Sequence, residues 1–386
     1  MTTAPRILLG VTADESLILM SGFPSFLVSK GWEVHLVASP GPRLAALSTV
    51  DGVHAHELPM RRNPAPIHDL ISLFRWIRLV RQVRPDVVSV GTPKAGLLGG
   101  LASFLNRVPS RVYQLRGLRL ETSRGLSREL YRVLERAAAG SAHVVLSVSR
   151  SLSAAAVRQS VVKPAKIEMI GEGSSNGVDT DRFRPKGGAE SSDLRQQLGI
   201  EAEVPVVGFV GRLTRDKGLD VLAEACELLV RRNVEHQLLV VGGIDSAREN
   251  SASQQFAAAG GRPAIVTGHV ADTQPFYAVM DVFCLPTLRE GFPNVVLEAS
   301  ASEIPVVTTD ATGAVDSVAS GRTGLIAAAG SAHELANQLE ALINDATLRK
   351  EMGEAARKWT IENFDRENVW NRTESFYRGL YDRDRN

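Results

Sequence analysis

The sequence predicts an α/β protein built from two doubly wound domains, each with its own parallel sheet. Short β-branched runs alternate with longer segments of helical periodicity along the whole chain. These runs are mainly apolar, without a regular polar alternation, which is typical of strands covered on both faces. The chain has 386 residues, too many for one ordinary hydrophobic core. We therefore expect ligands to bind where the carboxyl ends of the strands face a cleft between the domains.

The expected elements fall into two series. Strands are expected at 6–12, 34–39, 86–90, 111–115 and 144–148, with a helix over 16–30, and again at 204–210, 237–241, 264–267, 282–285 and 306–308. The Pro- and Gly-containing segment 184–192 is interpreted as a linker. An aromatic-rich helix is expected over 365–381, where its apolar face must pack on another element. The predicted domains are 1–184 and 185–364, followed by a terminal segment, 365–386.

The charge distribution divides the chain. The net charge is +1, but residues 60–160 hold 17 Lys and Arg against 5 Asp and Glu. A basic half indicates an anionic partner. Anionic lipid, or a diphosphate-linked acceptor at a membrane surface, fits better than nucleic acid, because no nucleic-acid-binding motif is present. The alternative is that the Arg-rich helices simply have solvated faces.

Targeting and redox signals are few. No apolar run is long enough to span a bilayer, and the first residues lack the apolar region of a signal peptide. We therefore expect a cytoplasmic protein, with peripheral contact at the inner face of the cell membrane as a further option. The two cysteines, Cys226 and Cys284, are expected to be buried reduced thiols, and no thiolate metal site is expected.

The strongest motif is Glu290-Gly-Phe-Pro-Asn-Val-Val-Leu-Glu298. Pro293 suits the start of a helix, so Glu290 should lie in the loop before that helix and Glu298 inside it. The free N–H groups of a helix start, beside Gly291, form a corner for anions and hydroxyls. Glu298 could accept two ribose hydroxyls. The alternative is a plain amphipathic helix with a solvated Glu.

A second motif, residues 208–220, ends a strand at Gly211 and places Arg212 and Lys217 on the next loop. An Arg fork and a Lys point charge suit a diphosphate. The spacing does not match a P-loop, because Asp216 stands where that motif needs Gly. Cations before a helix start oppose the helix dipole, unless an anion shares the site.

A third motif, residues 176–185, starts with a tight Asn-Gly turn, and Asp179 can cap the short segment after it. Asp179 and Asp181 could be taken for a metal-binding pair. We interpret them as structural, because they lie at the expected domain junction. No metal ligand is predicted.

These three motifs, in this order, resemble glycosyltransferase family 4, the retaining enzymes with the GT-B fold of two Rossmann-like domains. The resemblance implies that Arg212 and Lys217 hold the donor diphosphate, Glu298 holds the ribose and Glu290 contacts the donor sugar. It implies that Phe292 and Asn294 lie near that sugar and that Val270 meets the base. Gly211 and Val295 complete the predicted donor-binding set. It also implies that the terminal helix crosses back to the N-terminal domain.

The N-terminal half resembles a subgroup that builds bacterial surface polysaccharides, through Thr92-Pro-Lys-Ala-Gly96. The resemblance implies that this segment starts a helix near the acceptor, with Lys94 available for a phosphate. Many family members have a catalytic-site His after the next strand, where this chain has Arg116. Arg116 is therefore a candidate anion or hydroxyl contact. The alternative is a structural arginine.

The implied function is retaining transfer of a hexose or N-acetylhexosamine from a nucleotide-diphosphate sugar to a glycan or a lipid-linked acceptor. The subgroup favours a UDP-linked donor, with GDP-mannose as the alternative. No cofactor and no metal are expected, because the two cations offset the leaving-group charge. A nucleotide-sugar epimerase, a non-catalytic nucleotide-sugar-binding protein and a nucleic-acid-binding protein are competing interpretations.

Overall fold

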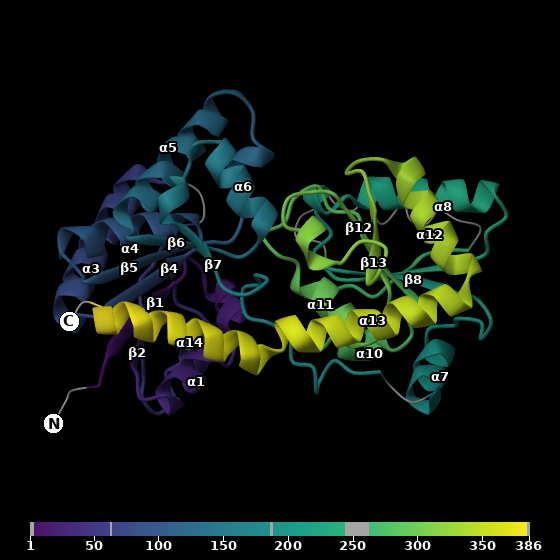
Figure 1. Cartoon of the computed structure of the whole chain (residues 1–386), viewed down its shortest axis with the longest axis horizontal. Coiled ribbons are helices and arrows are strands. Elements are labelled where there is room, and N and C mark those ends of the chain that lie inside the picture. The colour runs from purple at the N-terminus through teal and green to yellow at the C-terminus, as the bar shows by residue number, and fades with distance from the viewer. Residues whose placement is uncertain (1–3, 62–63, 186–187, 244–261, 384–386) are drawn as a thin grey trace. The chain divides into compact units, whose positions relative to one another are not determined.

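The computed structural model describes residues 4–61, 64–185, 188–243 and 262–383. The chain forms two compact units (Figure 1). Unit 1 holds Met1–Asn176 together with Glu367–Asn386, and unit 2 holds Gly177–Arg366. The chain therefore crosses between the units twice.

Unit 1 is built on a seven-stranded parallel sheet with the strand order β3-β2-β1-β4-β5-β6-β7. Its strands are β1 (Arg6–Gly10), β2 (Glu33–Ala38), β3 (Val53–Glu57), β4 (Val87–Gly91), β5 (Ser110–Leu115), β6 (Val144–Ser147) and β7 (Ile167–Met169). Its α-helices are α1 (Phe23–Ser29), α2 (Pro42–Leu47), α3 (Pro66–Val83), α4 (Pro93–Leu105), α5 (Gly125–Ser141), α6 (Arg150–Arg158) and the last helix, α14 (Arg366–Arg383). Short 3-10 helices cover Asp14–Met20, Arg119–Glu121 and Pro164–Lys166.

Two apolar cores lie on the two faces of the unit 1 sheet, because successive side chains of a strand point to opposite faces. Trp76 and Val80 of α3 pack on Leu8 and Val37. The other core gathers side chains of β1, β2, α1 and α14, among them Phe23 and Tyr377. The terminal helix is thus part of the core of unit 1.

Unit 2 repeats the plan with a six-stranded parallel sheet in the order β10-β9-β8-β11-β12-β13. Its strands are β8 (Val206–Val210), β9 (Gln237–Val241), β10 (Ile265–Val266), β11 (Val282–Leu285), β12 (Val306–Thr309) and β13 (Gly324–Ala327). Its α-helices are α7 (Gly188–Gln197), α8 (Leu219–Arg231), α10 (Gln274–Tyr277), α11 (Asn294–Ala301), α12 (Ala332–Asn344) and α13 (Ala346–Phe364), with 3-10 helices at Arg215–Lys217 and Val315–Ser317. Two doubly wound parallel α/β units confirm the predicted fold class.

Several details differ from the sequence-based expectations. The helix expected over 16–30 is broken into a 3-10 helix and α1, because Gly22 between them has a φ of 80°. The short strands β3, β7 and β13 were missed: β3 and β7 contain His or Glu and lack a continuous apolar run, and β13 is an apolar run of only four residues. The segment 184–192, expected to link the two domains, lies within unit 2, and α7 begins inside it at Gly188. The chain passes between the units after Asn176 and again after Arg366.

Among the described residues, no helix combines the length and the apolar character that crossing a bilayer requires.

Candidate functional site

The candidate site of unit 2 lies at the carboxyl ends of β8 and β11. The chain runs from β8 outward to β9 and β10, then returns to β11 on the other side of β8. Such a reversal of strand order opens a crevice outside the carboxyl ends of the two strands, and ligands of open α/β sheets bind there. The loop after β8 carries Arg212 and Lys217, and the loop after β11 carries Glu290.

The structure brings Lys217 and Glu290 together, although they are far apart in the sequence. The Lys217 Nζ donates a short hydrogen bond to Glu290 Oε1, and the two side chains are only 17% and 14% exposed. In such a shielded position an ion pair is much less screened by water than it would be at the surface. The pair joins one predicted diphosphate-binding cation to the predicted sugar-binding carboxylate.

Thr287 ties the same two loops together. Its Oγ1 lies 3.0 Å from the Asp216 carbonyl oxygen and 3.1 Å from the Arg289 carbonyl oxygen, either of which can accept its single proton, and 3.4 Å from Glu290 Oε1. The Leu288 N–H donates to the same Asp216 carbonyl at 2.9 Å. The side chain is fully buried, so the loss of these bonds would be costly. Sequence reasoning missed Thr287; the signal available was a Thr directly after a strand and a Pro.

Asp216 and Arg289 form a second link between the loops. Arg289 Nη2 lies 3.3 Å from Asp216 Oδ2, while Thr214 Oγ1 donates to the other oxygen at 2.6 Å. The pKa of Asp216 is lowered: burial raises it, but the bond from Thr214 and the nearby Arg289 and Lys217 outweigh that effect. The carboxylate therefore stays charged and fixes the loop that presents Lys217.

Two glycines allow the loops to approach closely. Gly218 has a φ of 71°, and a Cβ there would lie 1.9 Å from the carbonyl oxygen of Pro286. Gly313, with a φ of 77°, would place a Cβ 2.3 Å from the carbonyl oxygen of Gly291. Both positions require glycine for conformation and for space. The loop after β12 is thereby held against Glu290, whose N–H donates to the carbonyl oxygen of Thr312 at 2.9 Å.

The helix start predicted from the Glu-Gly-Phe-Pro-Asn motif is present. α11 begins at Asn294, and Pro293 is its N-cap. Phe292 is buried and packs on Phe364, with ring centroids 5.2 Å apart, so it is an anchor for the loop. Among the described residues nothing donates to the buried Asn294 Oδ1. An acceptor in that position is available to a ligand hydroxyl.

Glu298 lies inside α11, as predicted, and its carboxylate is held by a hydrogen bond from Tyr277. The Tyr277 hydroxyl donates to Glu298 Oε2 at 2.7 Å and lies 3.4 Å from the Val295 carbonyl oxygen. Burial raises the pKa of Glu298, while the bond from Tyr277 works in the opposite direction. Tyr277 fixes one carboxylate oxygen, which leaves the other for further hydrogen bonds. Tyr277 was also missed, because nothing in its local sequence points to Glu298.

The remaining predicted donor-site residues lie on loops at the same edge of the sheet. Arg212 is exposed and directly follows Gly211, whose N–H donates to the Val241 carbonyl at 3.0 Å. Val270 follows Gly268, which is tied to Gly242 after β9 by a 3.1 Å backbone bond. These positions agree with a site that runs across the ends of β9, β8 and β11.

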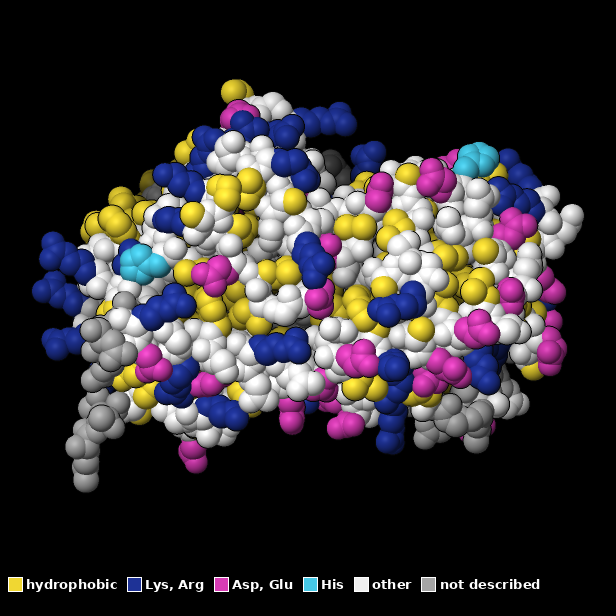
Figure 2. Space-filling model, viewed as in Figure 1, with side chains coloured by type: hydrophobic (Ala, Val, Ile, Leu, Met, Phe, Trp, Pro, Cys, Tyr) yellow, Lys and Arg dark blue, Asp and Glu magenta, His cyan; other side chains and the backbone are white. Residues whose placement is uncertain are grey.

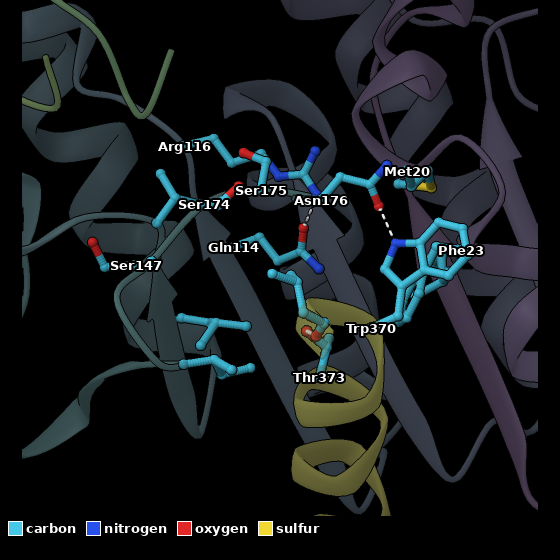
Figure 3. A pocket seen from close by; sticks show the side chains of 16 residues that line it. Met20, Phe23, Gln114, Arg116, Ser147, Ser174, Ser175, Asn176, Trp370 and Thr373 are labelled. Carbon is cyan, nitrogen blue, oxygen red and sulfur yellow. Dashed lines mark hydrogen bonds between the residues drawn. The ribbon is translucent and has the colours of Figure 1, made fainter. Parts of the chain in front are cut away.

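Arg116 lies in a pocket of unit 1 at the carboxyl end of β5 (Figure 3). Its Nη2 donates to Gln114 Oε1, its Nη1 lies 3.4 Å from the Leu19 carbonyl, and its buried Nε has no partner among the described residues. Burial lowers the pKa of the guanidinium to about 10, which leaves it charged at neutral pH. None of the described residues that line the pocket is a carboxylate, and its polar side chains include Ser147 and Asn176. The pocket can therefore receive an anion or hydroxyls.

Two further residues singled out in the sequence, Lys94 and Asp179, each form an ion pair. Lys94, expected to be available for a phosphate, is paired with Asp69 at 2.6 Å and is only 11% exposed. Asp179 caps the turn after it, through a 3.0 Å bond from the Arg182 N–H, as predicted. It also pairs with Arg366 at 2.9 Å. Asp179 thus has a structural role at the position where the chain enters unit 2.

The two doubly wound units and the terminal helix that packs on unit 1 define a protein of the GT-B architecture. Comparisons with known proteins agree. Residues 26–173 match the family model described as "Glycosyl transferase 4-like domain", and residues 204–345 match "Glycosyl transferases group 1". The chain belongs to the family 4 glycosyltransferases and is an enzyme of that class.

Individual relatives support this assignment. The chain is 36% identical, over 95% of both chains, to the capsular polysaccharide biosynthesis glycosyltransferase CapM of Staphylococcus aureus. It is 28% identical, over 68% of both chains, to the UDP-Gal:α-D-GlcNAc-diphosphoundecaprenol α-1,3-galactosyltransferase of Escherichia coli. The structure of HepE from Anabaena, in complex with UDP and glucose, superposes with a TM-score of 0.81 at 21% identity, covering 97% of this chain and 100% of that one.

Proposed function

We propose that the enzyme transfers a hexose or N-acetylhexosamine, with retention of configuration, from a UDP-linked donor to a lipid-linked or glycan acceptor in polysaccharide biosynthesis. The observation that carries the donor assignment is the Lys217–Glu290 pair, held by Thr287 at the switch point of the unit 2 sheet. A UDP-bound neighbour of the same fold and a relative named for a UDP-sugar support a UDP-linked donor. Another relative, 31% identical over 80% of this chain, is named as GDP-mannose-dependent, so GDP-mannose is the alternative donor to be tested.

The donor diphosphate would lie against Arg212 and Lys217. Charge grows on the leaving phosphate in the transition state, and preorganised cations stabilise it without reorganisation of solvent. Because two side-chain cations are placed on this loop, we propose that transfer needs neither a metal ion nor another cofactor. When the diphosphate binds Lys217, the hydrogen bond between Lys217 and Glu290 would weaken. Glu290 would then contact the hydroxyls of the donor sugar.

The nucleoside would extend from the diphosphate toward the ends of β9 and α11. Glu298 would accept the ribose hydroxyls with the oxygen that Tyr277 leaves available, and the backbone at Val270 would face the base. Gly211, Asn294 and Val295 would line the path between them. The acceptor hydroxyl would attack from the face of the leaving group, since we identify no enzymatic nucleophile among the residues of the proposed site that the structure describes.

The acceptor side is assigned to unit 1, with Arg116 as the anion or hydroxyl contact. A pyrophosphate-linked glycolipid offers both anionic oxygens and sugar hydroxyls, and the name of the Escherichia coli relative contains such an acceptor. Lys94 is not assigned to phosphate, because Asp69 occupies it.

Unit 1 also carries a surface suited to an anionic membrane. α4 contacts both α3 and α5, so the three helices form one layer. Large exposed apolar side chains lie on this layer: Ile67, Leu70, Ile71 and Phe74 on α3, Phe104 and Leu105 at the end of α4, and Leu126, Leu130 and Val133 on α5. We call these residues the α3–α5 patch.

Arginines accompany the α3–α5 patch. Arg75, Arg78 and Arg81 are exposed on α3, and Arg128 and Arg136 are exposed on α5. Figure 2 shows Lys and Arg gathered over these helices. Apolar side chains that enter the interface, together with arginines that meet lipid phosphates, favour an anionic bilayer over nucleic acid. A lipid-linked acceptor would reach the enzyme at that surface.

An Arg212→Ala variant tests the donor assignment. Removal of one preorganised cation should lower the rate of sugar transfer by about 100-fold or more, while the fold is kept because Arg212 is exposed. Transfer from UDP-sugars to a polyprenyl-diphosphate sugar is measured with added EDTA. Arg231→Ala, at the far end of α8, is the control and should keep wild-type turnover. Near wild-type turnover of Arg212→Ala would overturn the assignment.

Vesicle binding tests the membrane assignment. Phe74→Ser combined with Ile67→Ser should reduce co-sedimentation with phosphatidylglycerol-containing vesicles several-fold, and added salt should weaken wild-type binding. Val230→Ser, a partly exposed residue of α8, is the control. Equal binding to purely zwitterionic vesicles, or wild-type binding by the double variant, would contradict the proposal.

A further inference from the structure

Three histidines and a glutamate lie together on one face of the edge of the unit 1 sheet. β3 is the edge strand and pairs in parallel with β2, with His35 opposite His54. Side chains alternate between the faces of a strand, so Glu33 and His35 share a face of β2. The same alternation puts His54 and His56 together on β3. We call these four residues the His–Glu cluster.

Three of the four residues are close enough to share one ion. The candidate ligand atoms of Glu33, His35 and His54 all lie within 4.8 Å of one another. The His35 and His54 rings are stacked at a centroid distance of 4.8 Å. Two ligands of a tetrahedral zinc ion are about 3.4 Å apart, given bonds of roughly 2.1 Å. Small rotations of these side chains would therefore be enough to bring the three ligand atoms around an ion.

Hydrogen bonds already orient the central ring. His35 Nε2 lies 3.0 Å from Glu33 Oε1, and His35 Nδ1 lies 2.9 Å from His56 Nε2. An ion bound between Glu33 and His35 would take the Nε2 lone pair, so His35 would carry its single proton on Nδ1 and donate it to His56. Such a bond on the second ring nitrogen is the usual support of a metal-bound histidine.

We propose that Glu33, His35 and His54 form a binding site for a divalent transition metal ion of the zinc type, with His56 holding the His35 ring. Imidazole nitrogens with one carboxylate are a ligand set that such ions favour. His54 is exposed, which gives the ion a path of entry, and His35 is buried. Arg6 binds the other oxygen of Glu33 at 3.0 Å and leaves Oε1 to the cluster.

The location assigns the ion a structural role. Glu33 is the first residue of β2, and ligands of a parallel sheet bind at the opposite, carboxyl end. An ion held by β2 and β3 would fasten the edge strand to the sheet. An ion at this site would take no part in the transfer reaction. The expectation that transfer needs no metal is therefore unchanged.

The test uses the full untagged chain after treatment with EDTA. Titration with Co²⁺ should give the visible absorption of a four- or five-coordinate site and saturate at one equivalent. Zn²⁺ should compete for the same site and raise the unfolding temperature by mass action. His54→Asn, at an exposed position, and Glu33→Gln should each weaken binding at least tenfold. His333→Asn, an exposed histidine of α12, is the control and should bind as wild type does.

Absence of the Co²⁺ signal in the wild-type chain would overturn the proposal. The same holds for saturation of His54→Asn at the wild-type concentration, since the ion would then bind elsewhere. Circular dichroism of each variant before titration identifies the folded protein, and loss of binding counts in favour only for variants that are folded. Loss of binding by His54→Asn with an unchanged His333→Asn would support the site.

Discussion

Thr287 gives the most direct test of the site at the scale of single residues. Its hydroxyl joins the loop of Lys217 to the loop of Glu290. Thr287→Val keeps the shape of the side chain and removes these bonds. We expect unit 2 to lose about 1–3 kcal/mol of stability, because buried carbonyls lose a donor. We also expect kcat to fall roughly tenfold, since misplacement of catalytic groups is costly.

Thr308→Val is a matched control for this change. Thr308 is equally buried, and its hydroxyl donates to the carbonyl of Leu285, within β11, at 3.0 Å instead of joining the loops of Lys217 and Glu290. Denaturant unfolding and initial rates of transfer are measured for both variants. Similar losses of stability with a selective loss of kcat in Thr287→Val are expected. Equal kcat values for Thr287→Val and Thr308→Val would show that Thr287 does not position the Lys217–Glu290 pair.

At the scale of elements, α14 orients the Arg116 pocket through Tyr377. The Tyr377 hydroxyl lies 2.8 Å from Ser89 Oγ and accepts from Gln114 Nε2 at 2.9 Å, and Gln114 in turn accepts from Arg116. Tyr377→Phe keeps the packing but leaves Gln114 less restrained. We expect a stability loss of about 1–2 kcal/mol. We also expect a higher KM for the acceptor, with the donor KM unchanged.

Steady-state kinetics with each substrate varied separately check this prediction. Tyr381→Phe, another tyrosine of α14 that packs edge-on against Trp32, is the control and should leave both KM values unchanged. A rise in the donor KM alone would place the effect of Tyr377 outside unit 1. The pair of variants thus separates positioning of Arg116 from general loosening of the helix.

Another element-scale prediction concerns α5 and pH. Glu135 is buried, accepts from the Tyr113 hydroxyl at 2.6 Å, and has its pKa raised from 4.5 to about 7 by burial, against the opposing effects of Tyr113 and Arg119. Between these pH values the unfolded chain binds fewer protons than the folded one, so stability falls as pH rises. The shift corresponds to roughly 3 kcal/mol.

Glu135→Gln should remove this pH dependence, because the amide stays neutral and its oxygen can still accept from Tyr113. Unit 1 should then lose less stability than the wild type between pH 5 and pH 8, as followed by tryptophan fluorescence during urea unfolding. Glu129→Gln, an exposed glutamate of the same helix, is the control. Parallel pH profiles of the wild type and Glu135→Gln would contradict the assignment.

At the scale of the whole molecule, unit 1 depends on the end of the chain. Trp370, Tyr377 and Leu380 of α14 belong to the same core as Phe23. Each buried side chain of this size contributes about 1.5–3 kcal/mol, so together they approach the stability of a typical domain. A chain truncated after Phe364 should therefore have a loosened or unfolded unit 1.

Dye binding to exposed apolar surface and the fluorescence of Trp32 and Trp76 measure this effect. Both tryptophans lie in unit 1 and are retained in the truncated chain. A chain that ends after Tyr381 keeps the packed part of α14 and is the control. Native-like Trp32 and Trp76 fluorescence in the shorter chain would show that the core of unit 1 forms without α14.

The sequence alone predicted the fold class and much of the candidate site. Runs such as 237–241 and 282–285 match their strands, because a strand buried on both faces is mainly apolar and lacks a regular polar alternation. Glu290 before α11 and Glu298 within it follow from the local rules of a helix start. The family, and with it the enzyme class, followed from the same motifs and is confirmed by the comparisons.

Only the tertiary structure decided which distant side chains meet. The Lys217–Glu290 pair, the Tyr277–Glu298 bond, the Tyr377 network and the His–Glu cluster all join residues whose own neighbours in sequence do not indicate a partner. The same is true of the unit boundaries, because Asn176 and Arg366 are separated by all of unit 2. The physical reason is that periodicity and capping act within a few residues, whereas strand order and register set the long-range contacts.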